Sequence, residues 1–232
     1  MDAVLVDMDG TLVDSEKLWD RALDDLMAHL GAGPLPEPAR HETVGGSLRF
    51  STGVCFREAG RPDPSEQDMA VACDWLFARA GELFSEGLPW RPGAHELLRG
   101  LHAAGLPVAL VTNTVRSLTE TALDTLGRGY FAASVCGDEV SRPKPDPEPY
   151  ARAADLLGVE PARCLAVEDS PAGATSAEAA GCVVLVVPCE LPVPGGPRRA
   201  QRATLEGVTV DELNRVHAGT SGPERTVRGD ER

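Results

Sequence analysis

The sequence predicts a doubly wound α/β fold, in which helices cover both faces of a parallel sheet. Five short segments are predominantly apolar, as strands buried on both faces require: residues 3–6, 107–111, 133–136, 164–167 and 183–187. Helical patterns separate most of these segments, and a repeated alternation of strand and helix is typical of a parallel sheet. One long interruption follows the first strand, because residues 13–89 contain no convincing strand.

Helices are expected where apolar side chains recur at helical spacing. Four segments between the later strands show this spacing: residues 93–104, 114–126, 148–157 and 171–180. Ser170 stands directly before Pro171, and a serine followed by proline is typical of a helix N-terminus. After Pro188 the chain becomes rich in Pro, Gly and Arg, and we expect only one further short element, at residues 209–216.

The long interruption is expected to be a helical insertion. Two apolar stripes at helical spacing lie within it, the first from Leu18 to Leu30 and the second from Met69 to Phe84. Gly31 ends the first stripe, as glycine commonly ends a helix. We therefore expect a core domain of residues 1–14 and 90–217, a helical cap domain of residues 15–89, and a disordered tail of residues 218–232, which has almost nothing to bury.

Composition narrows the class of protein. The chain has 232 residues, of which 42% are hydrophobic and 25% charged, and its formal net charge of −14 disfavours a general nucleic-acid partner. No apolar run approaches the ~20 residues of a membrane span, and the acidic N-terminus does not resemble a signal peptide. The six cysteines form no CxxC pair. We expect a cytoplasmic protein, monomeric by default, with reduced and mostly buried cysteines.

Polar side chains gather after the predicted strands, where an open α/β sheet binds its ligands. They come from segments far apart in the chain: Asp7 and Asp9, Thr112 and Asn113, Lys144, and Glu168 and Asp169. Asp7 and Asp9 would point to the same side of a continuing strand, and two adjacent carboxylates repel unless a cation or a proton intervenes. Asp169 adds a third hard oxygen ligand, which suits Mg²⁺. A carboxylate beside a metal and a phosphate is also a plausible nucleophile.

Four segments together resemble, in order and spacing, the four motifs of the haloacid dehalogenase superfamily. They span residues 2–188 and comprise Asp7-Met8-Asp9-Gly10-Thr11, the hydrophobic run that ends in Thr112-Asn113, Lys144 in Lys-Pro-Asp-Pro, and Val167-Glu168-Asp169-Ser170. The resemblance implies a Rossmann-like core with an inserted cap. The stretch Asp14-Ser15-Glu16 is similar to the branch that contains sugar-phosphate phosphatases and β-phosphoglucomutases.

The resemblance also implies a role for each residue. Asp7 would attack phosphorus, and Asp9 would protonate the leaving alcohol and then activate water against the aspartyl-phosphate. Thr112 and the Asn113 backbone amide would hold phosphoryl oxygens, which Lys144 would neutralise. Mg²⁺ would be bound by Asp7, the Asp9 backbone carbonyl and Asp169, with Glu168 nearby or in the next layer of residues. These groups match the charge that develops in phosphoryl transfer.

The expected function is a Mg²⁺-dependent phosphomonoesterase that acts on a small phosphorylated metabolite, such as a sugar or polyol phosphate. A β-phosphoglucomutase-like mutase is the alternative. It is less favoured because Trp19 stands where the mutases place a histidine on the first cap helix. An inactive binding protein of the same fold is less favoured still, since Asp7, Asp9 and Lys144 are all present. In the cap, Gly46 and Arg49 are the candidate substrate-binding residues.

Overall fold

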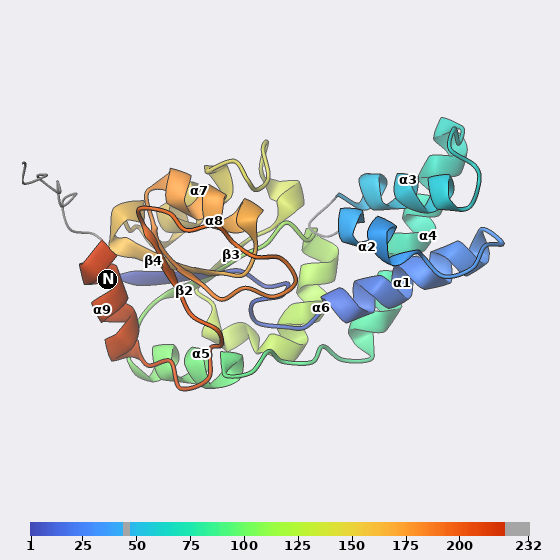
Figure 1. Ribbon diagram of the computed structural model, residues 1–232. Coiled ribbons are helices and arrows are strands. Elements are labelled where there is room, and N and C mark those ends of the chain that lie inside the picture. The colour runs from blue at the N-terminus through green and yellow to red at the C-terminus, as the bar shows by residue number, and fades with distance from the viewer. Residues whose placement is uncertain (44–46, 221–232) are drawn as a thin grey trace, which may run out of the picture.

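A six-stranded parallel sheet forms the centre of the computed structural model, which describes residues 1–43 and 47–220 (Figure 1). The strands lie in the order β3-β2-β1-β4-β5-β6. Their bounds are Ala3–Val6 for β1, Val108–Val111 for β2, Ala133–Val135 for β3, Cys164–Glu168 for β4, Val183–Val186 for β5 and Arg199–Gln201 for β6. Because β1 pairs with both β2 and β4, the ends of these three strands are neighbours at one edge of the sheet.

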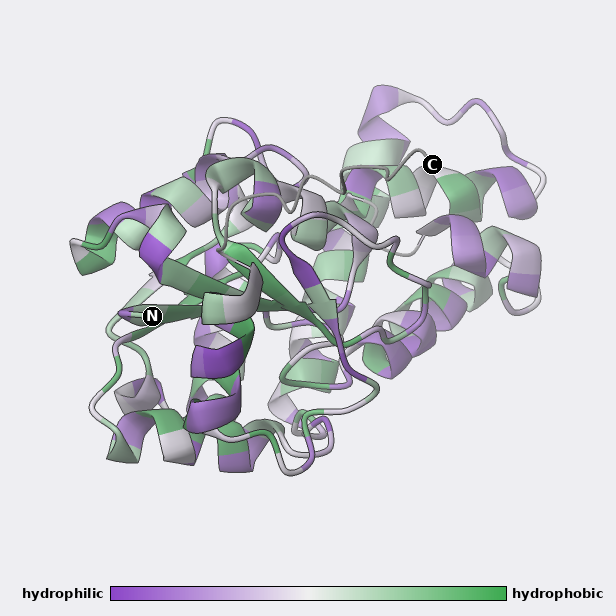
Figure 2. Cartoon of the chain, turned by 60° about the vertical axis from the view of Figure 1, so that its left-hand side comes forward, coloured by the Kyte–Doolittle hydropathy of each residue, from purple (hydrophilic) through white to green (hydrophobic). Residues whose placement is uncertain are grey.

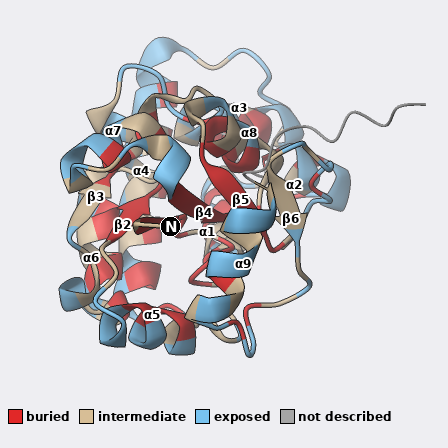
Figure 3. Ribbon diagram, turned by 90° about the vertical axis from the view of Figure 1, so that its left-hand side faces the viewer, coloured by how far each residue is buried: buried red, intermediate tan, exposed pale blue. Residues whose placement is uncertain are grey.

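Helices cover both faces of the sheet, which confirms the predicted fold class. One face packs against α5 (Ala94–Ala103), α6 (Arg116–Leu126) and α9 (Val210–Thr220), and the other against α7 (Glu148–Leu157) and α8 (Pro171–Ala180). Within β1, Val4 and Val6 join the first core, whereas Ala3 and Leu5 join the second. Strands β1, β2, β4 and β5 are therefore buried on both sides, and they form the buried centre of the sheet in Figure 3.

Among the described residues, four helices lie between β1 and α5, within the segment expected to be a helical insertion. They are α1 (Glu16–His29), α2 (Glu37–Thr43), α3 (Leu48–Glu58) and α4 (Glu66–Ser85). Buried side chains of α1 and α4 face each other, among them Leu26 and Leu76. These helices pack together to one side of the sheet (Figure 1), and α4 also contacts α6. In Figure 2 the central strands are hydrophobic, whereas the helices alternate between hydrophobic and hydrophilic residues.

Two chain segments connect these helices to the sheet, and they pair with each other. The backbone N–H of Asp14 donates to the Pro89 carbonyl at 2.8 Å, and the N–H of Arg91 donates to the Leu12 carbonyl at 2.9 Å. Val13 and Trp90 form an antiparallel bridge between these bonds. The entry and exit of the helical segment are thereby joined to each other as well as to the sheet.

The structure adds elements that the apolar pattern did not predict. Strand β6 was missed because an edge strand pairs through its backbone and does not need apolar side chains. The short helices α2 and α3 were also not distinguished. Helix α9 extends through Thr220, so residues 218–220 are helical rather than part of a disordered tail, and residues 221–232 lie outside the described residues. Three short 3-10 helices complete the fold, at Arg128–Tyr130, Gly137–Glu139 and Pro161–Arg163.

The cysteines agree with the expectation of reduced, mostly buried side chains. All six are free thiols, and four of them are buried: Cys55, Cys136, Cys164 and Cys182. No helix in the described part of the chain combines the length and the hydropathy that a membrane span needs.

Candidate active site

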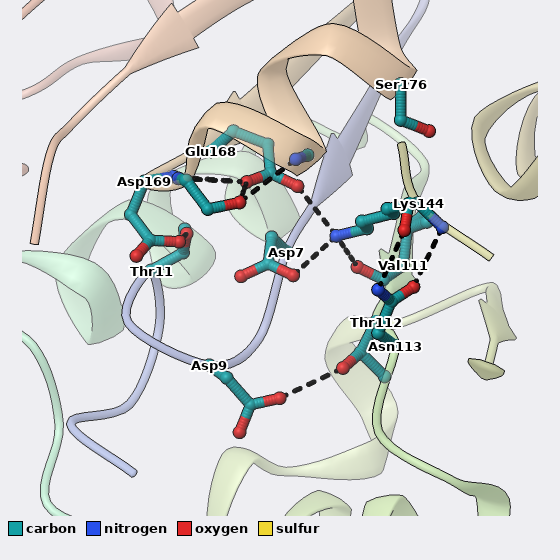
Figure 4. A network of polar contacts seen from close by, with 12 residues as sticks. Asp7, Asp9, Thr11, Val111, Thr112, Asn113, Lys144, Glu168, Asp169 and Ser176 are labelled. Carbon is teal, nitrogen blue, oxygen red and sulfur yellow. Dashed lines mark hydrogen bonds and ion pairs between the residues drawn. The ribbon is translucent and has the colours of Figure 1, made fainter. Parts of the chain in front are cut away.

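Lys144 lies at the centre of the polar edge of the sheet, where it joins three strands. Its ammonium group donates to Asp7 Oδ1 at 2.6 Å, to Glu168 Oε1 at 2.6 Å and to the Val111 carbonyl at 2.8 Å. These acceptors follow or end β1, β4 and β2, so the parallel order of the sheet brings them together (Figure 4). All three ammonium hydrogens are used, as the burial of Lys144 requires.

Glu168 is fully buried, and both of its carboxylate oxygens accept hydrogen bonds. Oε1 accepts from Lys144 and from the Tyr150 hydroxyl at 2.6 Å. Oε2 accepts from the Ser170 hydroxyl at 3.2 Å and from the backbone N–H groups of Asp169 and Ser170. These donors account for a carboxylate in an otherwise apolar core, where an unpaired charge would be strongly destabilising.

Asn113 fixes the loop that carries Lys144. Its side-chain oxygen accepts from the Lys144 backbone N–H at 3.0 Å, and its side-chain nitrogen donates to the Lys144 carbonyl at 3.3 Å. Gly137 lies against the same turn, since a Cβ at this position would stand 2.2 Å from the Asn113 carbonyl oxygen. The loop after β2 and the loop that follows β3 are thus held in one arrangement, which aims Lys144 at Asp7.

Three buried carboxylates form a group that fits a divalent cation. One oxygen from each of Asp7, Glu168 and Asp169 lies within 4.8 Å of the others. Asp7 Oδ2 is buried and has no hydrogen-bond partner among the described residues. With Lys144 as the one cation in contact, two formal negative charges remain unbalanced, so a hard divalent ion such as Mg²⁺ suits the group in both charge and ligand chemistry.

The titration of these acids reflects the same excess of negative charge. Burial raises the pKa of Asp7 well above its ordinary value; the Lys144 ammonium opposes the rise, and the Glu168 carboxylate adds to it. Burial and then the Glu168 carboxylate raise the pKa of Asp169 to about 8. Burial acts to lower the pKa of Lys144, but the two carboxylates in contact with it outweigh burial and raise it. Lys144 therefore stays charged while the acids favour a proton or a cation.

Gly10 and Thr11 set the position of Asp169. The Thr11 hydroxyl donates to Asp169 Oδ1 at 3.0 Å. Gly10 has a φ of +79°, and a Cβ at this position would stand 2.2 Å from Asp169 Oδ2. Glycine is therefore needed twice here, for the left-handed backbone and for the close approach of the carboxylate.

The Asp9 carboxylate does not belong to the group of three carboxylates. It accepts hydrogen bonds from three hydroxyl groups instead. Ser15 donates to Asp9 Oδ1 at 2.6 Å, and Thr112 and Thr114 donate to Oδ2 at 3.0 and 2.7 Å. Thr112 itself is fixed by the Thr114 backbone N–H at 3.0 Å. Since Ser15 directly precedes α1, the Asp9 carboxylate connects the loop after β2 with the first helix of the inserted segment.

Glu16 and Cys189 lie beside Asp169 on the side of the inserted helices. Together these three residues form a second group of ligand atoms within 4.8 Å of one another. The Cys189 thiol donates to Glu16 Oε2 at 3.5 Å. Burial and then the Glu190 carboxylate raise the pKa of Glu16 to about 7. The first turn of α1 therefore reaches the loop after β5 next to the acidic group.

The candidate residues of the helical insertion lie apart from this network. Arg49 is exposed in the first turn of α3, where its guanidinium pairs with Glu66 at 2.8 Å. Gly46 lies outside the described residues. Trp19 is half-buried in α1 and packs edge-on against Phe84, with ring centroids 5.8 Å apart.

Sequence reasoning missed the residues that position the expected ones. Ser15 stands in the Asp14-Ser15-Glu16 stretch and Thr114 directly follows Thr112-Asn113, but the sequence did not indicate that both would bind Asp9. Tyr150 carries no motif signal by itself. For Tyr150 a signal was present, because Tyr150, Ala153 and Ala154 share the face of α7 that packs on the sheet. A tyrosine on a buried helix face needs a partner for its hydroxyl, and here the partner is Glu168.

Most of the chain is similar to known proteins in both sequence and structure. Residues 1–181 match the family model described as haloacid dehalogenase-like hydrolase. Hexitol phosphatase B of Escherichia coli is 35% identical over 189 residues, which cover 80% of this chain and 83% of that protein. A phosphoglycolate phosphatase of Cupriavidus necator is 33% identical over 201 residues, covering 84% of each protein. The crystal structure of CbbY from Rhodobacter sphaeroides in complex with xylulose-(1,5)bisphosphate superposes with a TM-score of 0.80 at 27% identity, covering 92% of this chain and 99% of that chain.

Proposed function

The chain belongs to the haloacid dehalogenase-like hydrolases, and from this membership we propose that it is a Mg²⁺-dependent phosphatase of small sugar or polyol phosphates. The observation that carries the proposal is the hydrogen bonding of the Asp7 carboxylate. This buried carboxylate has one oxygen on Lys144 and the other without a partner in the described structure, at the edge of the sheet where an α/β fold binds ligands. The phosphatases among the relatives support the same reaction.

Asp7 is the proposed nucleophile. Its carboxylate would attack phosphorus, the phosphorus–oxygen bond to the leaving alcohol would break, and an aspartyl-phosphate would form on Asp7. Lys144 would hold the Asp7 side chain in one orientation and offset the negative charge of the incoming phosphoryl group. The hydrogen bond between Asn113 and the Lys144 backbone supports this role, because it fixes the loop that carries Lys144.

Mg²⁺ would be held by Asp7, Asp169 and the Asp9 backbone carbonyl, and it would neutralise phosphoryl oxygens and orient them toward Asp7. We assign Glu168 to the neighbouring layer, because both of its oxygens already accept hydrogen bonds from protein donors. Its contribution would be to hold Lys144 and Tyr150 in place.

Asp9 is the proposed proton donor to the leaving alcohol and the later base for water. In the structure its carboxylate is held by Ser15, Thr112 and Thr114. To act on a substrate it must exchange one of these hydroxyls for the leaving oxygen. Ser15 stands at the start of α1, so a movement of the proposed cap domain, residues 15–89, would release this bond.

The paired segments at Leu12–Asp14 and Pro89–Arg91 are the proposed hinge of that movement. Their backbone bonds would keep the two connections together while the helices rotate. Small-angle X-ray scattering tests the movement. We expect a smaller radius of gyration with Mg²⁺ and a phosphate analogue than without them, and identical profiles would contradict closure.

Arg49 and Gly46 remain the proposed substrate-reading residues of the cap. Arg49 is exposed, and its pairing with Glu66 at the surface is weak enough for an anionic group of a substrate to compete with it. Packing of Trp19 against Phe84 supports hydrolysis over the mutase reaction, because this position offers an apolar contact rather than a histidine.

The deciding experiment is phosphate release from a panel of hexitol, sugar and short-acid phosphates, with Mg²⁺ and with chelator. We expect Mg²⁺-dependent release from at least one member of the panel. Conversion of hexose 1-phosphate to 6-phosphate without net phosphate release would instead establish the mutase. Silence in both assays, with the protein folded, would contradict the proposed activity.

A further inference from the structure

A cavity lies beside the proposed active site, in the part of the chain that forms the sheet. It has a volume of about 270 Å³. Its walls come from the loop after β1, the connection into α5, the loop after β5 and the segment after β6, and the residues that matter below are Thr11, Arg91, Val187, Thr204, Leu205 and Glu206. None of the proposed catalytic residues lines it.

Two of the segments that line this cavity, the connection into α5 and the segment after β6, are in direct backbone contact. Gly93 has a φ of +82°, and a Cβ at this position would stand 2.2 Å from the Leu205 carbonyl carbon. The connection into α5 is therefore pressed against the segment after β6. On the other side, Arg202 donates to the backbone carbonyls of Thr204 and Glu206, at 3.0 and 3.1 Å. These contacts keep the cavity open in a defined shape.

Arg91 gives the cavity its charge. Its side chain is half-buried and makes no hydrogen bond or ion pair with the described residues. Every other half-buried arginine in residues 1–43 and 47–220 donates to a carboxylate or a backbone carbonyl: Arg40, Arg79, Arg116, Arg198, Arg199 and Arg202. A guanidinium has five N–H donors, and leaving them without acceptors at a partly buried position costs free energy. An anionic ligand would satisfy them.

Two further polar residues of the cavity restrict which anions could bind there. The Thr204 oxygen accepts from the Glu206 backbone N–H at 3.2 Å, which leaves its hydroxyl proton for a ligand oxygen. Glu206 also lines the cavity, and its carboxylate would repel an anion that has no proton to donate. Hydrogenphosphate meets both conditions, since it carries charged oxygens and a P–OH group.

We propose that this cavity binds inorganic phosphate, through the Arg91 guanidinium and the Thr204 hydroxyl, with Glu206 accepting the phosphate proton. The site is distinct from the catalytic one because it uses neither Asp7 nor Lys144. Thr11 belongs to both, since it lines the cavity and donates to Asp169. Phosphate is also the product of the proposed reaction, so the site would hold that product next to the place where it forms.

Metal dependence separates the two sites. Without a cation the catalytic acids carry an excess of negative charge and repel phosphate, and the Lys144 hydrogens are already used. The Arg91 site needs no metal. Equilibrium dialysis of the full chain against radiolabelled inorganic phosphate, in the presence of chelator, therefore reports on the Arg91 site alone.

The test compares Arg91→Gln with a matched control, Arg99→Gln. Arg99 lies on α5, is exposed and likewise makes no hydrogen bond or ion pair with the described residues. We expect one phosphate site in the wild type, at least about tenfold weaker binding in Arg91→Gln, and no change in Arg99→Gln. No binding by the metal-free wild type, or equal binding by the wild type and Arg91→Gln, would overturn the proposal. Circular dichroism shows whether each variant is folded.

A second arm tests the role of Glu206. Sulfate at neutral pH has no proton to donate, so we expect it to bind the wild type more weakly than phosphate does. Glu206→Gln removes the repulsion and should bring the two affinities together. Sulfate that binds the wild type as tightly as phosphate would contradict the assignment of hydrogenphosphate as the ligand.

Discussion

Lys144 and Tyr150 donate to the same atom, Oε1 of Glu168, each at 2.6 Å. The Lys144 ammonium also lies 5.1 Å from the centre of the Tyr150 ring. The loop that carries Lys144 and helix α7 thus meet at one carboxylate oxygen at the end of β4, and Tyr150 shares this acceptor with the proposed phosphate-neutralising lysine. The first prediction tests this relationship.

Tyr150→Phe removes one donor from a fully buried carboxylate. We expect the free energy of unfolding to fall by about 1–3 kcal/mol. We also expect kcat to fall by about tenfold, because Lys144 loses part of its orientation, while KM changes little. Steady-state kinetics and denaturant unfolding measure the two effects. Tyr130→Phe is the control, since Tyr130 is half-buried against histidine rings and its hydroxyl makes no hydrogen bond with the described residues. Equal kcat in Tyr150→Phe and the wild type would contradict the positioning role.

Asp7→Asn is expected to abolish turnover without unfolding the protein. The amide keeps the shape of the side chain and removes one of the repelling buried charges, but it cannot form an acyl phosphate. The measurements are phosphate release and thermal melting of the same preparation. Residual activity above about a hundredth of the wild-type rate would exclude Asp7 as the nucleophile.

Gly10→Ala is expected to weaken Mg²⁺ binding by at least about tenfold. The new methyl group would overlap Asp169 Oδ2, so the carboxylate must move away from Asp7. Gly60→Ala is the matched control: its φ is +74°, but nothing lies within 4 Å of the position its Cβ would take. Both variants carry the same backbone strain, and only Gly10→Ala should change the Mg²⁺ affinity measured by calorimetry. Equal affinities in the two variants would remove Asp169 from the proposed metal site.

The stabilising effect of Mg²⁺ is expected to grow with pH. Burial raises the pKa of Asp169 to about 8, above its ordinary value of 3.8, so the folded protein binds this proton more tightly than the unfolded chain does. Without metal, the contribution of Asp169 to the free energy of unfolding should therefore be fully present below about pH 4. It should be lost as the pH rises toward 8. Mg²⁺ binds the ionised carboxylate and should restore more stability at pH 8 than at pH 5.5.

The measurement is the melting temperature with Mg²⁺ and with chelator across this pH range. Asp169→Asn serves as the control and should show a smaller pH dependence of the Mg²⁺ effect, the remainder coming from Asp7, whose pKa burial also raises. A Mg²⁺ shift that is the same at pH 5.5 and pH 8 in the wild type would contradict the assignment of Asp169 as a ligand.

The sheet and its chemistry were largely predictable from local patterns. Strands such as Val183–Val186 are apolar on both faces, and the fold class follows from this property together with the alternation of strands and helices. Asp7, Lys144 and Asp169 could be expected to meet because each follows a strand of a parallel sheet, and such ends lie at one edge. Strand β6 was not predictable in this way, because a polar edge strand leaves no apolar signal.

The partners of these residues depend on contacts between segments distant in the chain. The amino-acid sequence by itself determined the α/β class, the place of the helical insertion and the identity of the acids and lysine, because hydrophobic periodicity and strand-end position are local properties. Only the tertiary structure decided that Tyr150 shares Glu168 with Lys144, that Ser15 binds Asp9 and that Arg91 faces a cavity without a partner. Each of these contacts depends on how helices, strands and loops pack against one another, and the spacing of side chains along the chain does not predict that packing.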